Sequence, residues 1–301
     1  MSQSTSHKRA FLRWAYDRLW YRWPIMLVPL VRRFKRDHGY SPNLFRPRSL
    51  NEKVLYRMLF DRRAFIPTFA GKLESREFVS ERIGSDILIP QIGVVYDAAD
   101  VRKIQFPSRF IMKGNHGSGM VYIHASDAPP DLDHLESLCD EWLRDDFAKR
   151  KREWCYKHVK RAVVVEDLLQ SDTDGGTPND YKFFCYDGVP RYIKVDRARF
   201  VAHTSDIFDC EWNSVPGKTL YPNSEVLPSP PPHLQQMIAI AAELSRGVDF
   251  VRVDLYDVGD GIRFGELTNT PARATETFTP RALDYTLGKY WNISTEELPD
   301  K

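Results

Sequence analysis

The sequence predicts an α+β fold in which antiparallel hairpins are separated by helices. Segments rich in valine, isoleucine and aromatic residues are typical of strands joined by short turns. Four such segments lie at residues 110–116, 120–124, 162–169 and 180–196. Apolar residues at helical spacing predict helices at 131–150 and 233–246. With 301 residues, the chain is long enough for one large or two modest domains.

The first 45 residues form a basic, aromatic-rich segment, which we expect to be a helical extension. Arginine and lysine recur through residues 8–36, together with Trp14 and Trp20. This mixture is typical of a helix that lies on an anionic membrane surface, and the alternative is a helix docked on its own domain. The apolar run 23–31 is too short to cross a bilayer, and no signal peptide is recognisable. We therefore expect a cytoplasmic protein, peripheral at the inner face of the membrane if the segment binds lipid.

Two helices are expected after this segment. Ser49 or Asn51 is a suitable cap for a helix over residues 52–59. A second helix is expected at 72–83, because Gly84 follows as a stop signal.

Residues 251–268 are predicted to form a hairpin, because apolar and polar residues alternate on both sides of a glycine-rich turn. A three-residue turn gives the opposed pairs Val258 and Ile262, Asp254 and Glu266, and Arg252 and Thr268. Like charges directly opposite each other destabilise a sheet. Asp254 and Glu266 should therefore share a proton or bind a divalent metal, and magnesium fits best. The alternative is a register shifted by one residue, with both acids solvated.

Lys113 ends a predicted strand and precedes a glycine-rich loop that contains Gly117, Ser118 and Gly119. Glycines allow backbone N–H groups to approach phosphate oxygens, and a lysine adds positive charge to the same anion. The alternative is an ordinary turn beside a surface lysine. This loop alone does not decide between them.

Charge and motifs exclude several classes of function. The net charge is only +2, so we expect no nucleic-acid partner. Four cysteines without a C-x-x-C pair argue against a zinc site and a disulfide framework, and for a reducing compartment. Residues 215–219 mimic the end of a P-loop, but Trp212 stands where its first glycine belongs. The glycine spacing at 114–119 is not the dinucleotide-binding fingerprint.

Charged residues follow one another in a characteristic order, namely Lys72, Lys113, Glu166, Lys182, Arg252, Asp254 and Glu266. This order resembles that of the ATP-grasp superfamily. The strings SLNEKVLYRMLFDR, FIMKGNHGSG, DYKFFCYDG and FVRVDLYDV...FGELT are similar to its teichuronopeptide-biosynthesis (TupA-like) branch. The resemblance covers nearly all of the chain after the basic segment, residues 45–290.

The resemblance implies an ATP-grasp fold, in which two α/β lobes with antiparallel sheets enclose ATP. Behind the extension at residues 1–45, an N-terminal α/β lobe would occupy residues 46–110. The ATP-grasp lobes would occupy residues 111–301, with the lid and hinge at 111–170 and the metal-binding lobe at 171–301.

The resemblance also implies the residues that bind ATP and magnesium. Phosphate contacts would come from Lys72, Lys113 and Lys182, with Gly117, Ser118 and Gly119 as a lid. The adenine hinge would be Glu166, Asp167 and Leu168. One or two Mg²⁺ ions would be held by Asp254 and Glu266, while Arg252 and Lys182 would stabilise the charge of the transferred phosphoryl group.

One position departs from the superfamily pattern. The last metal ligand is usually an asparagine two residues after the glutamate, where this chain has Thr268, and Asn269 lies one step further. A threonine hydroxyl is a poorer ligand, and strand alternation turns Asn269 to the opposite face unless the chain bends. The number of metal ions depends on this position.

The reaction that the resemblance implies is ATP-dependent ligation of a carboxylate to an amine through an acyl phosphate. In this branch the partners would be an amino acid and a uronic-acid sugar, or another small-molecule or glycan acceptor, in cell-surface polysaccharide assembly. Candidate residues for the substrate carboxylate are Arg197, Arg199, His203 and Arg273.

Two other functions remain open from the sequence. One is a phosphotransferase or glycosyltransferase that acts on the same glycans, because a fold does not fix the chemistry. The other is a nucleotide-binding scaffold without catalysis, recruited to a membrane or to the polysaccharide assembly machinery by the basic segment. The sequence predicts no particular oligomeric state.

Overall fold

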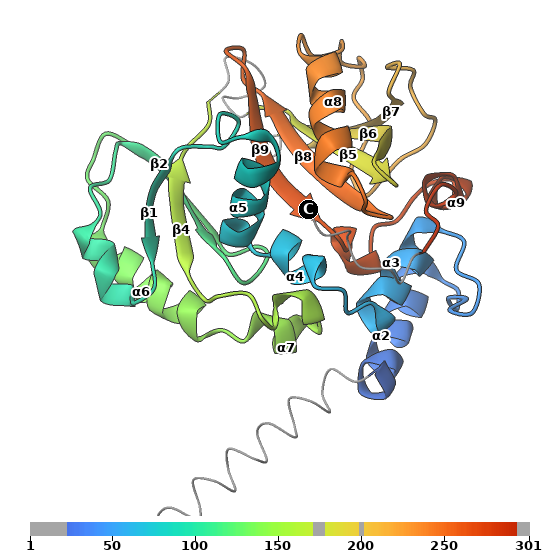
Figure 1. Ribbon diagram of the computed structural model, residues 1–301, viewed down its shortest axis with the longest axis horizontal. Coiled ribbons are helices and arrows are strands. Elements are labelled where there is room, and N and C mark those ends of the chain that lie inside the picture. Colours follow the sequence, from blue (N-terminus) through green and yellow to red (C-terminus); the bar gives the residue numbers. More distant parts are fainter. Residues whose placement is uncertain (1–22, 171–177, 199–201, 294–301) are drawn as a thin grey trace, which may run out of the picture.

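The computed structural model describes residues 23–170, 178–198 and 202–293. In these residues two antiparallel sheets stand side by side (Figure 1), which confirms the predicted α+β class. The first sheet has the order β1 (Gln91–Val95), β4 (Val163–Asp167), β2 (Arg109–Gly114) and β3 (Val121–Ala125). The second has the order β7 (Thr204–Asp209), β6 (Val189–Arg197), β5 (Asp180–Tyr186), β8 (Val251–Asp257) and β9 (Ile262–Thr268).

Helices cover both sheets. The α-helices are α2 (Trp23–His38), α3 (Leu50–Phe60), α4 (Phe65–Ala70), α5 (Lys72–Ile83), α6 (Leu132–Arg144), α7 (Phe147–Lys151), α8 (Leu234–Ser245) and α9 (Ala282–Gly288). Short 3-10 turns occur at Ala98–Lys103, Trp154–Tyr156 and Pro271–Ala274. No helix in the described ranges is both long enough and apolar enough to span a membrane.

Most predicted helices occur where we expected them. Ser49 caps α3 in a capping box with Glu52, and α5 has the predicted bounds. The single helix predicted at 131–150 is two helices, because Asp145 ends α6 and the Asp146 side chain then caps α7. Strand β7 was not predicted.

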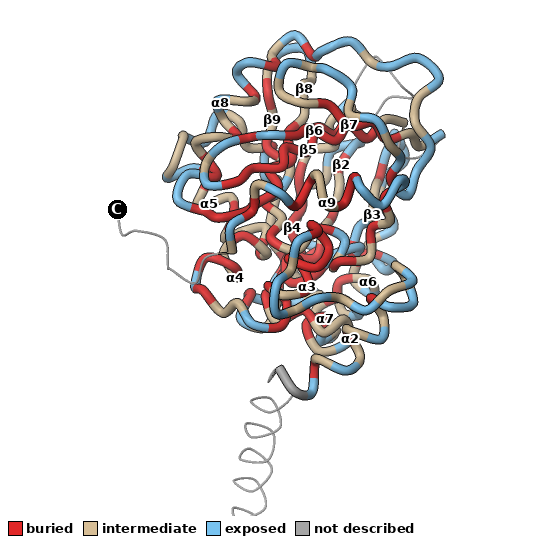
Figure 2. The backbone as a smooth tube through the Cα atoms, turned by 90° about the vertical axis from the view of Figure 1, so that its right-hand side faces the viewer, coloured by how far each residue is buried: buried red, intermediate tan, exposed pale blue. Residues whose placement is uncertain are grey.

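The five-stranded sheet has two different faces because side chains alternate along each strand. On one face, Tyr181, Phe183 and Cys185 of β5 pack into an apolar core with α8, α4 and α5. On the other face, Phe184 and Tyr186 pack with α2, α3 and α9. Figure 2 shows this buried backbone running through the middle of the molecule.

The four-stranded sheet is covered on one face by α6, whose Leu135, Cys139 and Trp142 pack on β1, β2 and β4. The division at residue 110 expected between two lobes falls inside β2, and β1 pairs with β4 in the same sheet.

Residues 87–90 connect the two sheets. The N–H of Phe264 in β9 donates to Ile87 O at 2.7 Å, and the N–H of Asp167 in β4 donates to Pro90 O at 3.1 Å. In Figure 1, α4 and α5 lie between the two sheets. The chain between α5 and β1 therefore links β9, an edge strand of the five-stranded sheet, to the end of β4 in the four-stranded sheet.

Candidate functional site

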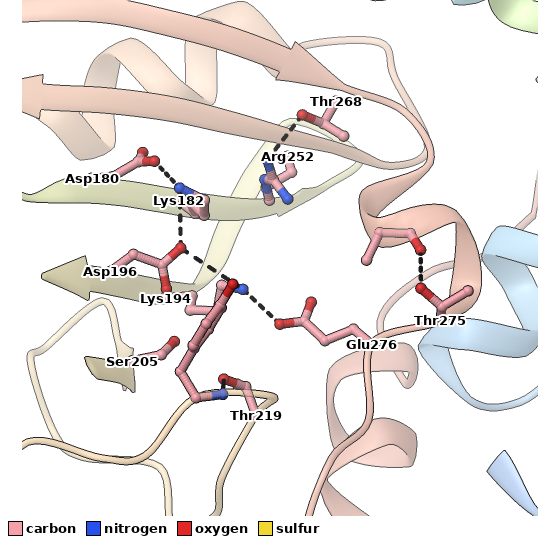
Figure 3. A network of polar contacts seen from close by, with 12 residues as sticks. Asp180, Lys182, Lys194, Asp196, Ser205, Thr219, Arg252, Thr268, Thr275 and Glu276 are labelled. Carbon is pink, nitrogen blue, oxygen red and sulfur yellow. Dashed lines mark hydrogen bonds and ion pairs between the residues drawn. The ribbon is translucent and has the colours of Figure 1, made fainter. Parts of the chain in front are cut away.

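A polar area occupies half of one face of the five-stranded sheet. Phe184, Tyr186 and Phe250 fill the half covered by α3 and α9. In the other half the same alternation places charged residues on the same face, namely Asp180, Lys182, Lys194, Asp196, Arg252 and Asp254, all buried. Because buried charges require partners, this area is a network of ion pairs (Figure 3).

The hairpin of β8 and β9 opposes Asp254 to Glu266 and Arg252 to Thr268, as predicted. The route to this register differs from the predicted one. The turn is one residue longer, since Asp257 rather than Val258 pairs with Ile262, and a bulge at Gly265 restores the register. A Cβ at position 265 would lie 3.0 Å from Asp254 O, so the close approach of the two strands favours glycine.

Arg252 binds both opposed carboxylates. Its Nε donates to Asp254 Oδ1 at 2.7 Å, and one terminal nitrogen donates to Asp254 Oδ2 at 2.6 Å and to Glu266 Oε1 at 2.7 Å. The Thr268 hydroxyl accepts from Arg252 at 3.1 Å and donates to Glu266 Oε1 at 2.8 Å. The like-charge repulsion that the sequence predicted is thus offset by a guanidinium within the protein.

The two carboxyls differ in acidity. Burial raises the pKa of Asp254, against the opposing attraction of Arg252 and Lys182. For Glu266, desolvation also acts to raise the pKa, but Arg252, the Thr268 hydroxyl and nearby lysines outweigh it and lower the pKa to about 2. The side chain of Glu266 is half exposed, whereas that of Asp254 is buried. Glu266 is therefore the more acidic and the more accessible member of the pair.

Lys182 lies among three carboxylates. It pairs with Asp180, with Asp196 at 3.2 Å and with Asp254 at 3.7 Å. Burial alone would lower the pKa of Lys182, but these carboxylates together raise it, so its charge is retained. Figure 3 shows Lys182 pointing toward both Asp180 and Asp196.

The network continues beyond Lys182 to residues that the sequence reasoning missed. Lys194 pairs with Glu276 at 2.6 Å and lies 4.0 Å from Asp196. Charged and apolar residues alternate along β5 and β6, for example at Asp180 and Lys182. This alternation in the sequence could have indicated that the charged residues share one face of the sheet.

Lys72 approaches the site from α5 and Lys113 from β2 of the four-stranded sheet. Lys72, the first residue of α5, donates to the carbonyls of Gly114 at 2.8 Å and Gly117 at 3.0 Å. Burial lowers the pKa of Lys72 to about 8, and both Glu266 and Lys113 act on it electrostatically. Lys72 thus lies between the glycine loop and the β8–β9 hairpin.

The glycine loop is anchored at its base and open at its tip. Asn115 and His116 are buried, and Asn115 Oδ1 accepts from the N–H of Leu73 at 2.9 Å. Ser118 and Gly119 are exposed. Gly117, the third residue predicted to close over phosphates, is buried.

The carboxylate of Glu166 forms ion pairs with two cations. Lys113 Nζ lies 2.7 Å from one oxygen, and an Arg76 nitrogen lies 2.8 Å from the other. Asp167 uses its N–H in the contact with Pro90, and Leu168 follows the end of β4. The side chain of Glu166 is therefore engaged within the protein by Lys113 and Arg76.

The candidate substrate residues lie at two opposite ends of the sheet. His203 Nε2 is 3.5 Å from Asp196 and its ring stacks on Tyr221, at the end where β6 finishes with Arg197. Arg273 follows the opposite end of β9 and lies 3.9 Å from Glu153. Arg199 lies outside the described residues.

Glu153 is a buried acid that the sequence did not single out. Burial raises its pKa to about 7, and both Arg273 and Arg33 counteract this shift. Its neighbour Arg273 has positive φ, as do the residues on either side of it. Such backbone conformations are unfavourable for residues other than glycine and often occur at functional sites.

Asn269 does not join the carboxylates. Its side chain is buried and donates to Ile66 O at 2.9 Å in α4, on the face away from Glu266. The alternation of β9 therefore continues past Thr268, as strand geometry predicted.

Comparison with known proteins identifies the family. The model of the TupA-like ATP-grasp family matches residues 52–292, and the chain belongs to this family. The expected ATP-grasp fold is thereby confirmed.

Solved structures with similar folds include ATP-grasp enzymes of low sequence identity. D-alanine–D-alanine ligase from Bacillus anthracis is 13% identical, with 68% of this chain and 54% of that chain covered and a TM-score of 0.38. A RimK domain ATP-grasp protein from Sphaerobacter thermophilus is 14% identical, with 79% and 67% covered and a TM-score of 0.37. The chain thus spans about half the length of the D-alanine ligase. No curated protein matches the sequence.

Proposed function

We propose that the protein is an ATP-dependent ligase that joins a carboxylate to an amine and releases ADP and phosphate. The observation that carries this proposal is the convergence of charges from both sheets. Lys72 contacts the glycine loop, and the charges of Lys113 and Glu266 both act on it. Membership of the TupA-like ATP-grasp family supports ATP as the nucleotide.

Three lysines, one on α5 and one in each sheet, suit the phosphates of ATP. Lys72, Lys113 and Lys182 are cations at the base of the site, and the exposed tip of the glycine loop supplies backbone N–H groups. The adenine would lie against the backbone of residues 166–168. Arg252 would stabilise the charge on the transferred phosphoryl group.

Asp254 and Glu266 fit a magnesium ion. They offer oxygen donors from two neighbouring strands, and Thr268 adds a hydroxyl beside Glu266. No group of three or more His, Cys, Asp or Glu in the described chain is arranged to hold a metal. Two carboxylates suit Mg²⁺, which usually completes its coordination with phosphate oxygens and water. When bound, the ion would neutralise phosphate charge.

The reaction would proceed in two balanced steps. A carboxylate oxygen of the first substrate attacks the γ-phosphorus and ADP leaves, which gives an acyl phosphate. The amine of the second substrate then attacks the acyl carbon, phosphate leaves, and one proton is released. The protein mainly positions the reactants and neutralises charge.

The proposed substrates are an amino acid and a uronic-acid sugar or another glycan acceptor, in polysaccharide assembly on the cytoplasmic side of the envelope. Arg273 at one end of the site and Arg197 with His203 at the other would bind their carboxylates, and Arg199 is a further candidate. Two separated cationic positions suit two separate substrates.

The test is to incubate the protein with ATP, Mg²⁺ and a panel of uronic acids and amino acids, and to identify products by mass spectrometry. We expect ADP and an amide. Asp254→Asn and Glu266→Gln should each lower turnover on the order of a hundredfold, because the metal loses a carboxylate. Asp260→Asn, in the exposed turn of the same hairpin, is the matched control and should retain activity. Unchanged ATP consumption in both variants would contradict the metal assignment.

A second candidate is a non-catalytic nucleotide-binding scaffold. The observation that favours it is the engagement of Arg252 with Asp254, Glu266 and Thr268 together, which already neutralises the two acids. Nucleotide binding without turnover on the whole panel would support the scaffold. ADP with a phosphorylated glycan and no amide would instead indicate a phosphotransferase.

A further inference from the structure

Helix α2 buries one face in the protein. Met26, Leu30 and Phe34 recur at a spacing of four residues and are 1–2% exposed. They pack in the core cluster that α3 and α9 also join. The described part of the basic segment is therefore a docked helix, as one of the two alternatives predicted.

The opposite face of α2 is exposed and amphipathic along its length. Ile25 and Val28 are 44% and 49% exposed near its start. Arg32, Lys35 and Arg36 are exposed one to three turns later. Asp37 pairs with Arg36 and offsets part of this charge. The helix thus presents an apolar pair beside cations, while its other face is fixed to the protein.

Helix α7 adds further cations beside α2. Its Ala148 lies in the same core cluster as Met26, and Figures 1 and 2 both place α7 and α2 at the same end of the molecule. The helix has the sequence FAKRK, with Arg150 exposed and Lys149 and Lys151 partly exposed. Asp145 pairs with Arg150. Two segments distant in sequence therefore present cations at the same end of the molecule.

We propose that this α2–α7 surface, made of Ile25, Val28, Arg32, Lys35, Arg36, Lys149, Arg150 and Lys151, docks on an anionic lipid bilayer. Cations attract anionic headgroups, and the exposed isoleucine and valine enter the boundary between headgroups and acyl chains. A soluble polyanion would use the cations alone. The apolar pair therefore favours a bilayer.

The sequence that precedes α2 agrees with this occupant. Residues 1–22 lie outside the described chain, but they contain Lys8, Arg9, Arg13, Arg18 and Arg22, together with Trp14 and Trp20. Their composition matches that of the surface, and they are joined to it directly at Trp23. The proposal does not depend on the ligase reaction.

The test is co-sedimentation of the full chain with vesicles of phosphatidylcholine, alone or mixed with phosphatidylglycerol, in the absence of ATP. We expect binding only to the mixed vesicles, weakened by salt. Arg32→Glu with Lys35→Glu should lower the partition coefficient at least tenfold, since each cation contributes about fivefold. Ile25→Ser with Val28→Ser should also lower it several-fold.

Two matched controls separate the surface from general charge and hydrophobicity. Lys103→Glu with Arg246→Glu reverses two exposed cations elsewhere, and Val121→Ser with Val189→Ser removes apolar residues of similar exposure. Both controls should bind as the unsubstituted protein does. Equal loss in a control, or no loss from the Ile25 and Val28 substitutions, would overturn the proposal. If the Ile25 and Val28 substitutions had no effect while the Arg32 and Lys35 substitutions still weakened binding, the surface would be a polyanion site instead.

Discussion

At the residue scale, Arg252 offsets the electrostatic repulsion between two carboxylates on adjacent strands. It is buried and makes hydrogen bonds to Asp254, Glu266 and Thr268. The sequence predicted that these acids need a cation, but it did not predict that Arg252 binds both of them. Pairwise contacts between side chains of one face depend on rotamers, which strand alternation does not determine.

Removal of this guanidinium should destabilise the protein. Arg252→Met leaves Asp254 buried opposite Glu266 with Lys182 as its remaining cation, and we expect a loss of about 3–5 kcal/mol in the free energy of unfolding. Urea denaturation at neutral pH measures it. Arg252→Lys should lose less, because it keeps the charge. A loss below about 1 kcal/mol for Arg252→Met would show that Arg252 is not the main partner of Asp254.

Glu153 should make stability depend on pH. Its pKa is raised to about 7 in the folded protein, so the folded state holds a proton that the unfolded chain releases near pH 4.5. The contribution of Glu153 to the free energy of unfolding should therefore be fully present below pH 4.5. It should decline by about 3 kcal/mol as the pH rises to 7. Glu153→Gln should remove this decline. Identical pH profiles of unfolding for the two proteins would contradict the buried, protonated acid.

At the element scale, the β8–β9 hairpin depends on the bulge at Gly265. The opposed pairs were predicted correctly from the sequence, although the prediction used a turn one residue shorter and no bulge. The longer turn and the bulge shift the register in opposite directions, so their effects on the pairing of Asp254 with Glu266 cancel. Bulges follow from local hydrogen bonding, which alternation of apolar residues does not reveal. Helix α5 was predictable because Gly84 ends it, whereas β7 was not, because its six residues lack a distinct pattern.

Substitution of the bulge glycine should disturb the site more than the fold. In Gly265→Val the added atoms would meet Asp254 O and the Tyr256 ring at 3.0 Å. We expect a cost of about 1–3 kcal/mol in stability and a loss of ATP turnover larger than that cost explains, because Glu266 moves relative to Asp254. Arg263→Ala on the same strand is the control. Full ATP turnover in Gly265→Val would show that activity does not require the bulge that places Glu266 opposite Asp254.

At the scale of the whole molecule, the site forms where two sheets approach each other. The order of the charged residues, with the four sequence strings that resemble the TupA-like branch, was enough to predict the ATP-grasp fold. In the structure these residues lie on α5 and on strands of both sheets. The Lys194–Glu276 pair was not predictable, because it joins β6 to a loop that is 82 residues away in sequence.

Lys72 binds the glycine loop and is attracted by Glu266 of the other sheet, and its titration should affect nucleotide binding. Its pKa of about 8 means that the ammonium is lost as pH rises through this value. The affinity for ATP should therefore fall above pH 8, and Lys72→Arg should move the fall to higher pH because an arginine stays protonated. Titration calorimetry across this range measures both. An affinity independent of pH in the unsubstituted protein would contradict a phosphate contact by Lys72.

The central claim is that a carboxylate is activated by phosphoryl transfer before an amine attacks it. The most direct measurement uses an acceptor labelled with ¹⁸O in its carboxylate, with ATP, Mg²⁺ and the amine, and analyses the released phosphate by mass spectrometry. Formation of an acyl phosphate predicts transfer of one ¹⁸O atom from the carboxylate to the phosphate. Amide formation with unlabelled phosphate would contradict it.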